Sequence, residues 1–151
     1  KEGRCSHRGF SLRIVDLPGT YSLTAYSTEE LVTRNFVLDV RPDVVVDVLD
    51  ASNVERHLYL TTQLMEMGAR LVLAFDMSDL AKRRGLEFDL PQLSSLLGTP
   101  IVPTVGNRGK GRDELLDALV TMAEKGGAVP ERRMSARRRA TPSSRLNGVV
   151  T

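Results

Sequence analysis

The strongest constraint on the fold is an apolar run at residues 43–50, which reads Asp-Val-Val-Val-Asp-Val-Leu-Asp. The run is too continuous in β-branched residues for a strand with one face in water. Such a pattern is typical of an interior strand in a parallel sheet, whose two faces are both covered by helices. Parallel neighbours also require long crossover connections, usually helical. The run therefore predicts an α/β protein.

Strand-like and helix-like segments alternate along the rest of the chain. This order predicts a mostly parallel sheet with helices on both faces, built from right-handed crossovers. A short strand at 3–6, turning back at 7–9, is expected before the others. The expected strands are 10–15, 43–50, 71–75 and 100–103, and the expected helices are 28–40, 54–67, 78–84, 90–97 and 113–124.

The composition changes after Gly126-Gly127, where arginine, serine, proline and small residues take over. We therefore expect one domain at residues 1–127 and a basic, poorly ordered tail at 128–151. The tail has no aromatic residue for base stacking and no apolar face, so no nucleic-acid partner is expected. The chain has one cysteine and no apolar stretch long enough for a membrane helix, which is consistent with a soluble, cytoplasmic chain.

Ligands of such sheets bind where the strands end, so residues directly after strands are the candidates for a site. The first set is Asp16, Leu17, Pro18 and Gly19, after the strand 10–15. A carboxylate here can hold a water of a bound magnesium ion, and glycine lets a backbone N–H approach a phosphate. The alternative is an ordinary strand-to-loop turn.

The second set is Asp76, Met77, Ser78 and Asp79, after the strand 71–75. A carboxylate such as Asp79 can accept from the two donors on one edge of guanine, whereas adenine presents the opposite polarity there. The alternative is a helix N-cap, with Asp76 or Ser78 capping the helix that follows.

The third set is Val105, Gly106 and Asn107, after the strand 100–103. Small residues there would let backbone N–H groups reach a base carbonyl, although a glycine-rich connector is the alternative. Lys110 does not belong to a phosphate-binding P-loop, because Gly111 follows it where that motif requires Ser or Thr.

Over about residues 1–119 the sequence resembles the FeoB family, whose members join a small cytoplasmic G domain to a membrane domain that admits ferrous iron. The resemblance depends on residues 14–23 (IVDLPGTYSL), residues 48–56 (VLDASNVER) and the loop at 104–111. It implies a P-loop GTPase-like G domain that binds GTP or GDP with magnesium at the cytoplasmic face of the bacterial inner membrane. Asp16 and Gly19 would sense the phosphate, with Asp16 holding magnesium through water, and residues 17–27 would form a switch. Asp79 would read guanine, and residues 105–107 would support the base.

Two departures from the family pattern affect this reading. The first strand and the phosphate loop of the family would precede Lys1, so we expect an N-terminally truncated G domain of low stability. Asp76 stands where the family has Asn, and a carboxylate would face guanine N7 and O6 unfavourably. No catalytic residue is assigned, the enzyme status of this chain is open, and no cofactor is firmly expected for it alone.

The leading hypothesis is a GTP-binding fragment of a ferrous-iron transporter, whose partners would be a guanine nucleotide and the membrane domain of the parent. The alternative is an inactive remnant or a nucleotide-free interaction module that keeps the fold. A GTPase acting on RNA would require a basic groove, which residues 1–127 do not suggest. The oligomeric state is left open.

Overall fold

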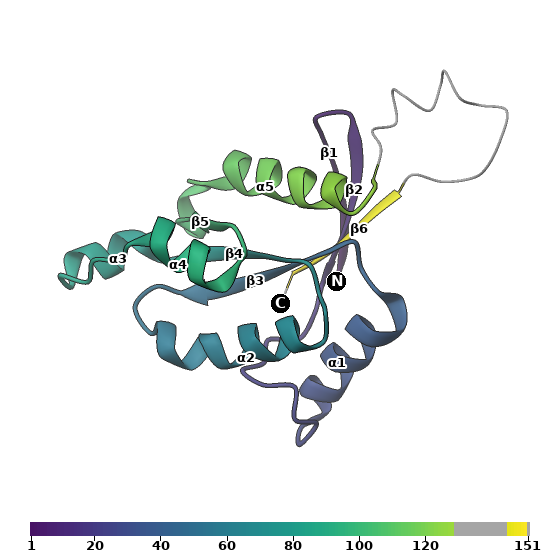
Figure 1. The fold of residues 1–151 in the computed structure, drawn as a ribbon, viewed down its shortest axis with the longest axis horizontal. Helices are drawn as coiled ribbons and strands as arrows, with labels where there is room; N and C mark the ends of the chain where they lie inside the picture. The colour runs from purple at the N-terminus through teal and green to yellow at the C-terminus, as the bar shows by residue number, and fades with distance from the viewer. Residues whose placement is uncertain (129–144, 151) are drawn as a thin grey trace, which may run out of the picture.

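The structure, a computed structural model, describes residues 1–128 and the backbone of residues 145–150. It contains one six-stranded sheet in the order β1-β2-β6-β3-β4-β5, in which only β1 runs antiparallel to its neighbour (Figure 1). The strands are β1 (Glu2–His7), β2 (Phe10–Asp16), β3 (Val44–Asp50), β4 (Leu71–Asp76), β5 (Ile101–Pro103) and β6 (Arg145–Val150).

Helices cover both faces of the sheet, as the sequence predicted (Figure 1). On one face α5 packs through Val120 and Ala123 against β3 and β4, where Val46 and Val72 are fully buried. On the other face Leu64 of α2 and Val37 of α1 pack against Val45 and Leu73. The helices are α1 (Thr28–Val40), α2 (Val54–Glu66), α3 (Ser78–Arg83), α4 (Leu90–Leu97) and α5 (Arg112–Lys125), with a 3-10 turn η1 (Gly106–Arg108) before α5.

The strand predicted from the apolar run is confirmed as β3, in the interior of the sheet. Alternate residues of β3 join the two cores, with Val44 and Val46 on one side and Val45 and Leu49 on the other. Both faces are therefore covered along most of the strand, with Val48 exposed near its end, which is why the run lacks the polar alternation of a half-exposed strand. Apolar burial on two faces makes β3 and β4 the rigid centre on which the loops at the strand ends are held.

The last strand, β6, is a difference from the sequence-based expectation. Residues 128–151 were expected to form a poorly ordered tail, yet residues 145–150 run parallel to β2 on one side and to β3 on the other. This segment of the chain therefore joins β2 to β3 in the sheet. Residues 129–144 and 151 lie outside the described residues, and the domain end near residue 127 stays a prediction.

Candidate nucleotide-binding site

The carboxyl ends of β4 and β5 bring two of the predicted sets together. The strands are neighbours, and Phe75 is level with Pro103 in their register. The backbone N–H of Thr104 donates to the carbonyl of Phe75 at 2.9 Å, so the chain is still paired one residue beyond β5. Residues 76–79 and 104–107 therefore leave the sheet side by side.

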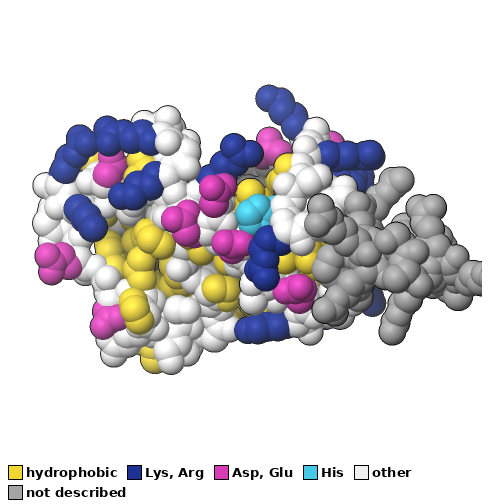
Figure 2. Space-filling model, turned by 90° about the horizontal axis from the view of Figure 1, so that it is seen from above, with side chains coloured by type: hydrophobic (Ala, Val, Ile, Leu, Met, Phe, Trp, Pro, Cys, Tyr) yellow, Lys and Arg dark blue, Asp and Glu magenta, His cyan; other side chains and the backbone are white. Residues whose placement is uncertain are grey.

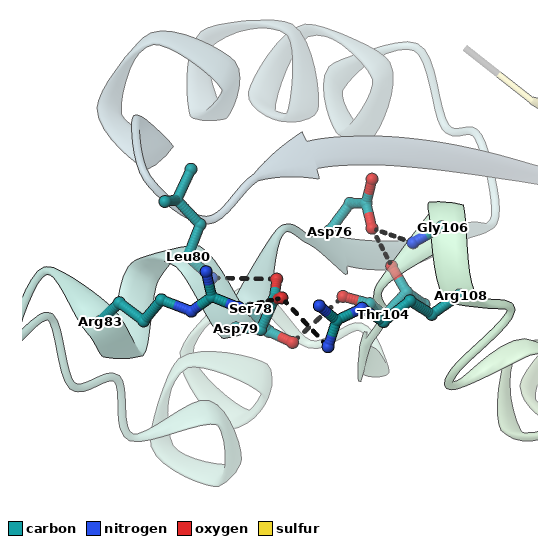
Figure 3. A network of polar contacts seen from close by, with 8 residues as sticks. All are labelled: Asp76, Ser78, Asp79, Leu80, Arg83, Thr104, Gly106 and Arg108. Carbon is teal, nitrogen blue, oxygen red and sulfur yellow. Dashed lines mark hydrogen bonds and ion pairs between the residues drawn. The ribbon is translucent and has the colours of Figure 1, made fainter.

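Asp76 ties these two loops together. Its Oδ1 accepts a hydrogen bond from the backbone N–H of Gly106 at 2.8 Å and another from the hydroxyl of Thr104 at 3.1 Å (Figure 3). Among the described residues, both hydrogen bonds of this side chain end on Oδ1. Figure 3 shows Oδ2 pointing away from them. One carboxylate oxygen thus holds the loop.

The alternative role of Asp76 or Ser78 as the N-cap of α3 is wrong. Met77 occupies the N-cap position, with a left-handed backbone at φ 53° and no side-chain cap bond. The Ser78 hydroxyl instead donates to the carbonyl of Thr104 at 3.1 Å. Asp76 and Ser78 are therefore turned towards the neighbouring loop instead of the helix, an arrangement that a simple cap would not produce.

Asp79 lies in the first turn of α3, beside the same loop. Its Oδ1 accepts from the backbone N–H of Leu80 at 2.9 Å, and its Oδ2 lies 3.5 Å from Arg83 Nη2 and 3.8 Å from Arg108 Nη1 (Figure 3). The carboxylate is about one-third exposed, and both arginines are mostly exposed. These long, solvated ion pairs are weak, so they can open to let a ligand reach Asp79. The proximity of Arg108 to Asp79 was not predicted.

The loops enclose a pocket with a volume of about 340 Å³. A volume of this size is at the lower end of small-molecule sites. The predicted residues of the second and third sets line it, except Ser78, which lines a neighbouring cavity. The lining residues are Asp76, Met77, Asp79, Leu80, Arg83, Val105, Gly106, Asn107 and Arg108.

The third loop closes on itself before α5 begins. Val105 donates from its backbone N–H to the carbonyl of Lys110 at 3.0 Å, which fixes the two ends of η1. Gly111 follows with φ 82°, and a Cβ at this position would lie 2.3 Å from the carbonyl oxygen of Pro103. Only glycine fits here, because any side chain would collide with the end of β5. The loop shape therefore depends on this one residue.

The first predicted set lies apart from the other two. Asp16 is level with Val150 of β6, which in turn is level with Val46 of β3, whereas Asp76 is level with Asp50 at the far end of β3. Asp16, Pro18 and Gly19 are exposed, and Leu17 is buried. The structure therefore brings the second and third sets together and keeps the first set separate, at the end of β2.

The segment that follows Gly19 is fastened to α2. The backbone N–H of Leu23 donates to Oε1 of Gln63 at 2.6 Å, and the Leu23 side chain is buried. The ring of Tyr21 lies under the guanidinium of Arg56, 3.7 Å from its centroid, and meets the ring of His57 edge-on. Sequence reasoning missed these contacts, since they join residues about forty positions apart, as Leu23 and Gln63 show.

Two titrating groups have shifted pKa values, His57 in the first turns of α2 and Asp50 at the end of β3. Burial and the neighbouring Arg56 lower the pKa of His57, against the opposing pull of Asp50. Partial burial would raise the pKa of Asp50, but hydrogen bonds from the hydroxyl and amide of Ser52 outweigh it, and the pKa is lowered. The lowered pKa favours the ionised form of Asp50, whose Oδ1 accepts the two hydrogen bonds of the turn after β3.

The magnesium prediction for Asp16 finds no further support in the geometry. Within residues 1–128, no group of three or more His, Cys, Asp or Glu side chains is placed to hold a metal ion. Asp16 alone would supply one contact, through water, to an ion whose other ligands came from elsewhere. The described residues do not form a magnesium site by themselves.

A larger cavity of about 710 Å³ lies beside the pocket, between α3, α4 and the end of β5. Its walls are mainly apolar, with Phe75 and Phe88 in edge-on contact 5.0 Å apart. Figure 2 shows hydrophobic side chains at the surface on this side of the molecule. The polar residues that line the cavity are Ser78, Lys82, Glu87 and Lys110. The smaller pocket has two carboxylates, those of Asp76 and Asp79, close to each other in the chain, and is the better candidate for a specific site.

The parallel sheet, the helices on both faces and the paired loops after β4 and β5 together define an α/β domain of the P-loop GTPase-like class, a G domain. A family described as "Ferrous iron transport protein B" matches residues 1–119. The chain belongs to this family, the FeoB proteins.

Curated relatives agree with this assignment. The chain is 50% identical over 125 residues to a "Fe(2+) transport protein A/Fe(2+) transporter FeoB fusion protein" of Porphyromonas gingivalis, which covers 82% of this chain and 15% of the relative. It is 40% identical over 119 residues to the "Fe(2+) transporter FeoB" of Escherichia coli K12. That match covers 76% of this chain and 15% of the relative. The chain thus spans about one-seventh of the length of these relatives, at 15% of each.

Solved structures place the fold in the same family. The FeoB G domain of Methanococcus jannaschii superposes with a TM-score of 0.81 at 44% identity, covering 82% of this chain and 80% of that one. The cytosolic domain of Thermotoga maritima FeoB in its GMPPNP form superposes with a TM-score of 0.78 at 37% identity. The match covers 82% of this chain and 50% of that one. The predicted fold class and family are confirmed. Across the described part of the chain, no helix is both long and apolar enough to cross a membrane.

Proposed function

We propose that this chain is the guanine-nucleotide-binding part of a ferrous-iron uptake transporter. In that role the pocket between residues 76–79 and 105–108 receives the base. The segment 16–27 responds to the phosphates and passes the change on through α2. In a longer protein of this family, GTP binding and hydrolysis would be coupled to iron(II) entry through a membrane domain at the cytoplasmic face of the bacterial inner membrane.

The observation that carries the proposal is the bond from the Gly106 N–H to Asp76. It draws the loop after β5 against the loop after β4, so that the backbone of residues 105–107 and the Asp79 carboxylate border one pocket. The Asp79 carboxylate matches the paired donors on one edge of guanine. Relatives solved with GMPPNP and with GDP bound support the same ligand class.

The phosphate side of the proposal depends on the end of β2. Asp16 is exposed there and would reach magnesium through a water, and Gly19 leaves its backbone open, with no atom within 4 Å of where a Cβ would stand. Movement of Gly19 towards a phosphate would pull on residues 20–23, which are bonded to α2 through Gln63. A segment that becomes ordered or disordered with the bound nucleotide is the usual switch of nucleotide-dependent proteins.

Calorimetric titration of the chain with GDP, and with ADP as a comparison, tests the proposal. The phosphate contacts of a complete site are not among the described residues, so we expect weak binding, detectable at high protein concentration. The Asp79→Ala variant removes the proposed base contact and should abolish the heat of GDP binding. An unchanged titration in this variant would contradict the proposed position of the base.

A further inference from the structure

The larger cavity, next to the base pocket, has no part in the proposed function. Its volume is about 710 Å³, compared with about 340 Å³ for the base pocket, and falls within the range of small-molecule sites. One wall comes from α3 and the chain that leads to α4, and another from the end of β5 and the loop before α5. The cavity and the base pocket have no lining residue in common, so a ligand in one does not use the side chains of the other.

The cavity presents apolar surface to water. Leu86 and Phe88, in the chain between α3 and α4, line the cavity and are 39% and 38% exposed. The ring of Phe88 meets the buried ring of Phe75 edge-on, and Phe75 lines the cavity as well. A ligand that covers this surface removes apolar area from water, which favours binding. A ligand with an aromatic ring can add an edge-on or offset ring contact.

Charged side chains from different walls border the same cavity. Lys82 belongs to α3, Lys110 to the loop before α5, and Glu87 to the chain between α3 and α4. Within residues 1–128, none of these three side chains forms a hydrogen bond or an ion pair with another residue. Two ammonium groups and one carboxylate leave one positive charge in excess at the cavity. Figure 2 shows basic side chains beside hydrophobic ones at the end of the molecule that carries α3.

We propose that this cavity is a second small-molecule site, which binds an aromatic monoanion such as an aryl carboxylate or an aryl sulfonate. The ring of the ligand covers Leu86 and Phe88, and its anionic group meets Lys82 and Lys110. Burial of the ring supplies most of the affinity. The lysines select for negative charge, each by a small amount, because ion pairs with exposed side chains are weak.

Fluorescence titration of the chain with two dyes tests the proposal. The dye 8-anilinonaphthalene-1-sulfonate is an aromatic monoanion, and N-phenyl-1-naphthylamine has the same rings without the sulfonate. Both dyes emit strongly only in apolar surroundings. We expect saturable binding of the anionic dye at a single site. Addition of GDP should leave its dissociation constant unchanged, because the cavity and the base pocket are lined by different residues.

Charge variants separate the two parts of the proposed recognition. Lys82→Gln and Lys110→Gln each remove one positive charge and should weaken binding of the anionic dye about threefold. Glu87→Gln removes the repulsive carboxylate and should strengthen that binding about twofold. Lys125→Gln, at the opposite end of α5 from the cavity, is the matched control and should leave it unchanged. The neutral dye should bind all four variants as it binds the unaltered chain.

The neutral dye also distinguishes a local effect from unfolding. A variant that loses its fold changes the binding of both dyes, whereas the proposal predicts a change for the anionic dye alone. The proposal is overturned if the anionic dye binds both lysine variants as tightly as the unaltered chain. It is also overturned if GDP displaces the dye, since the dye would then occupy the base pocket. Neither result depends on the function proposed for the base pocket.

Discussion

Asp47 in β3 accepts a hydrogen bond of 2.6 Å from the hydroxyl of Thr61 in α2, and both side chains are buried. The bond joins the centre of the sheet to the helix that also anchors residues 21–23. Burial raises the pKa of Asp47 to about 6, although the Thr61 bond opposes the change. A carboxylate in this environment makes the stability of the fold depend on pH.

The sign of this dependence follows from the raised pKa. Between pH 3.8, the ordinary value, and about 6, the native chain binds more protons at Asp47 than the unfolded chain does. The free energy of unfolding should therefore fall as pH rises through this window, by roughly 3 kcal/mol, and stay level above it as far as Asp47 is concerned. Urea unfolding at a series of pH values measures this contribution.

Two variants isolate Asp47 from the other carboxylates. Asp47→Asn cannot ionise, so the fall between pH 4 and 6 should become smaller, whereas Asp39→Asn on the surface should keep it. Thr61→Val removes the bond that favours the charged form, so the loss of stability should extend above pH 6. A profile of Asp47→Asn that matches the unaltered chain would contradict the assignment.

Gly111→Ala should destabilise the chain by roughly 2–4 kcal/mol. The residue has φ 82°, and a Cβ would lie 2.3 Å from the Pro103 carbonyl oxygen, so the end of β5 would have to move. Gly98→Ala provides the matched control, because its φ is 65° but nothing lies within 4 Å of the added atom. That variant should lose only about 1 kcal/mol, the cost of the left-handed backbone. Equal losses, measured by thermal unfolding, would show that the close approach is unimportant.

Gln63→Ala should release the segment around Leu23. The Leu23 N–H has Gln63 Oε1 as its acceptor at 2.6 Å, and the variant leaves this amide to water. Hydrogen exchange at Leu23 should become about tenfold faster, with a loss of about 1 kcal/mol in global stability. Gln92→Ala on the exposed surface of α4 should change neither quantity. Unchanged protection at Leu23 in Gln63→Ala would mean that this loop is held by its buried side chain alone.

Shortening the chain to residues 1–144 should split the sheet. In the described residues β2 and β3 are joined only through β6, which pairs with both. Its loss would leave two strand edges in water and cost at least about 2 kcal/mol. Gly148→Pro, which keeps the length but removes one backbone donor in β6, should produce part of the loss. A shortened chain with the same unfolding midpoint would contradict the pairing of β6.

The sequence was sufficient to predict the interior of the fold, for physical reasons that particular residues show. Val44, Val45 and Val46 fill both faces of β3, so the pattern alone identified a buried parallel strand and, with it, the helices that cover it. The candidate site was predictable to the same extent, because residues 76–79 and 105–107 directly follow neighbouring strands. The FeoB resemblance, confirmed by the comparisons, added roles that the pattern does not contain.

Other features depend on contacts that local patterns do not record. Residues 145–150 contain Asn147 and Gly148, both unfavourable in strands, and become a strand only because β2 and β3 offer partners on both sides. The orientation of the Asp76 side chain could not be predicted from the sequence either, since aspartate at this position commonly caps a helix. Its acceptor role became visible only when the structure placed Gly106 within 2.8 Å.

The central claim is that the loops after β4 and β5 form one pocket for a purine base. The most direct test is a solution NMR titration of the isotope-labelled chain with GDP, followed through the backbone amides. We expect the resonances of Asp79, Gly106 and Asn107 to shift together with one dissociation constant, while those at the far end of α5 stay in place. Shifts confined to other parts of the chain, with these three amides unchanged, would contradict the account.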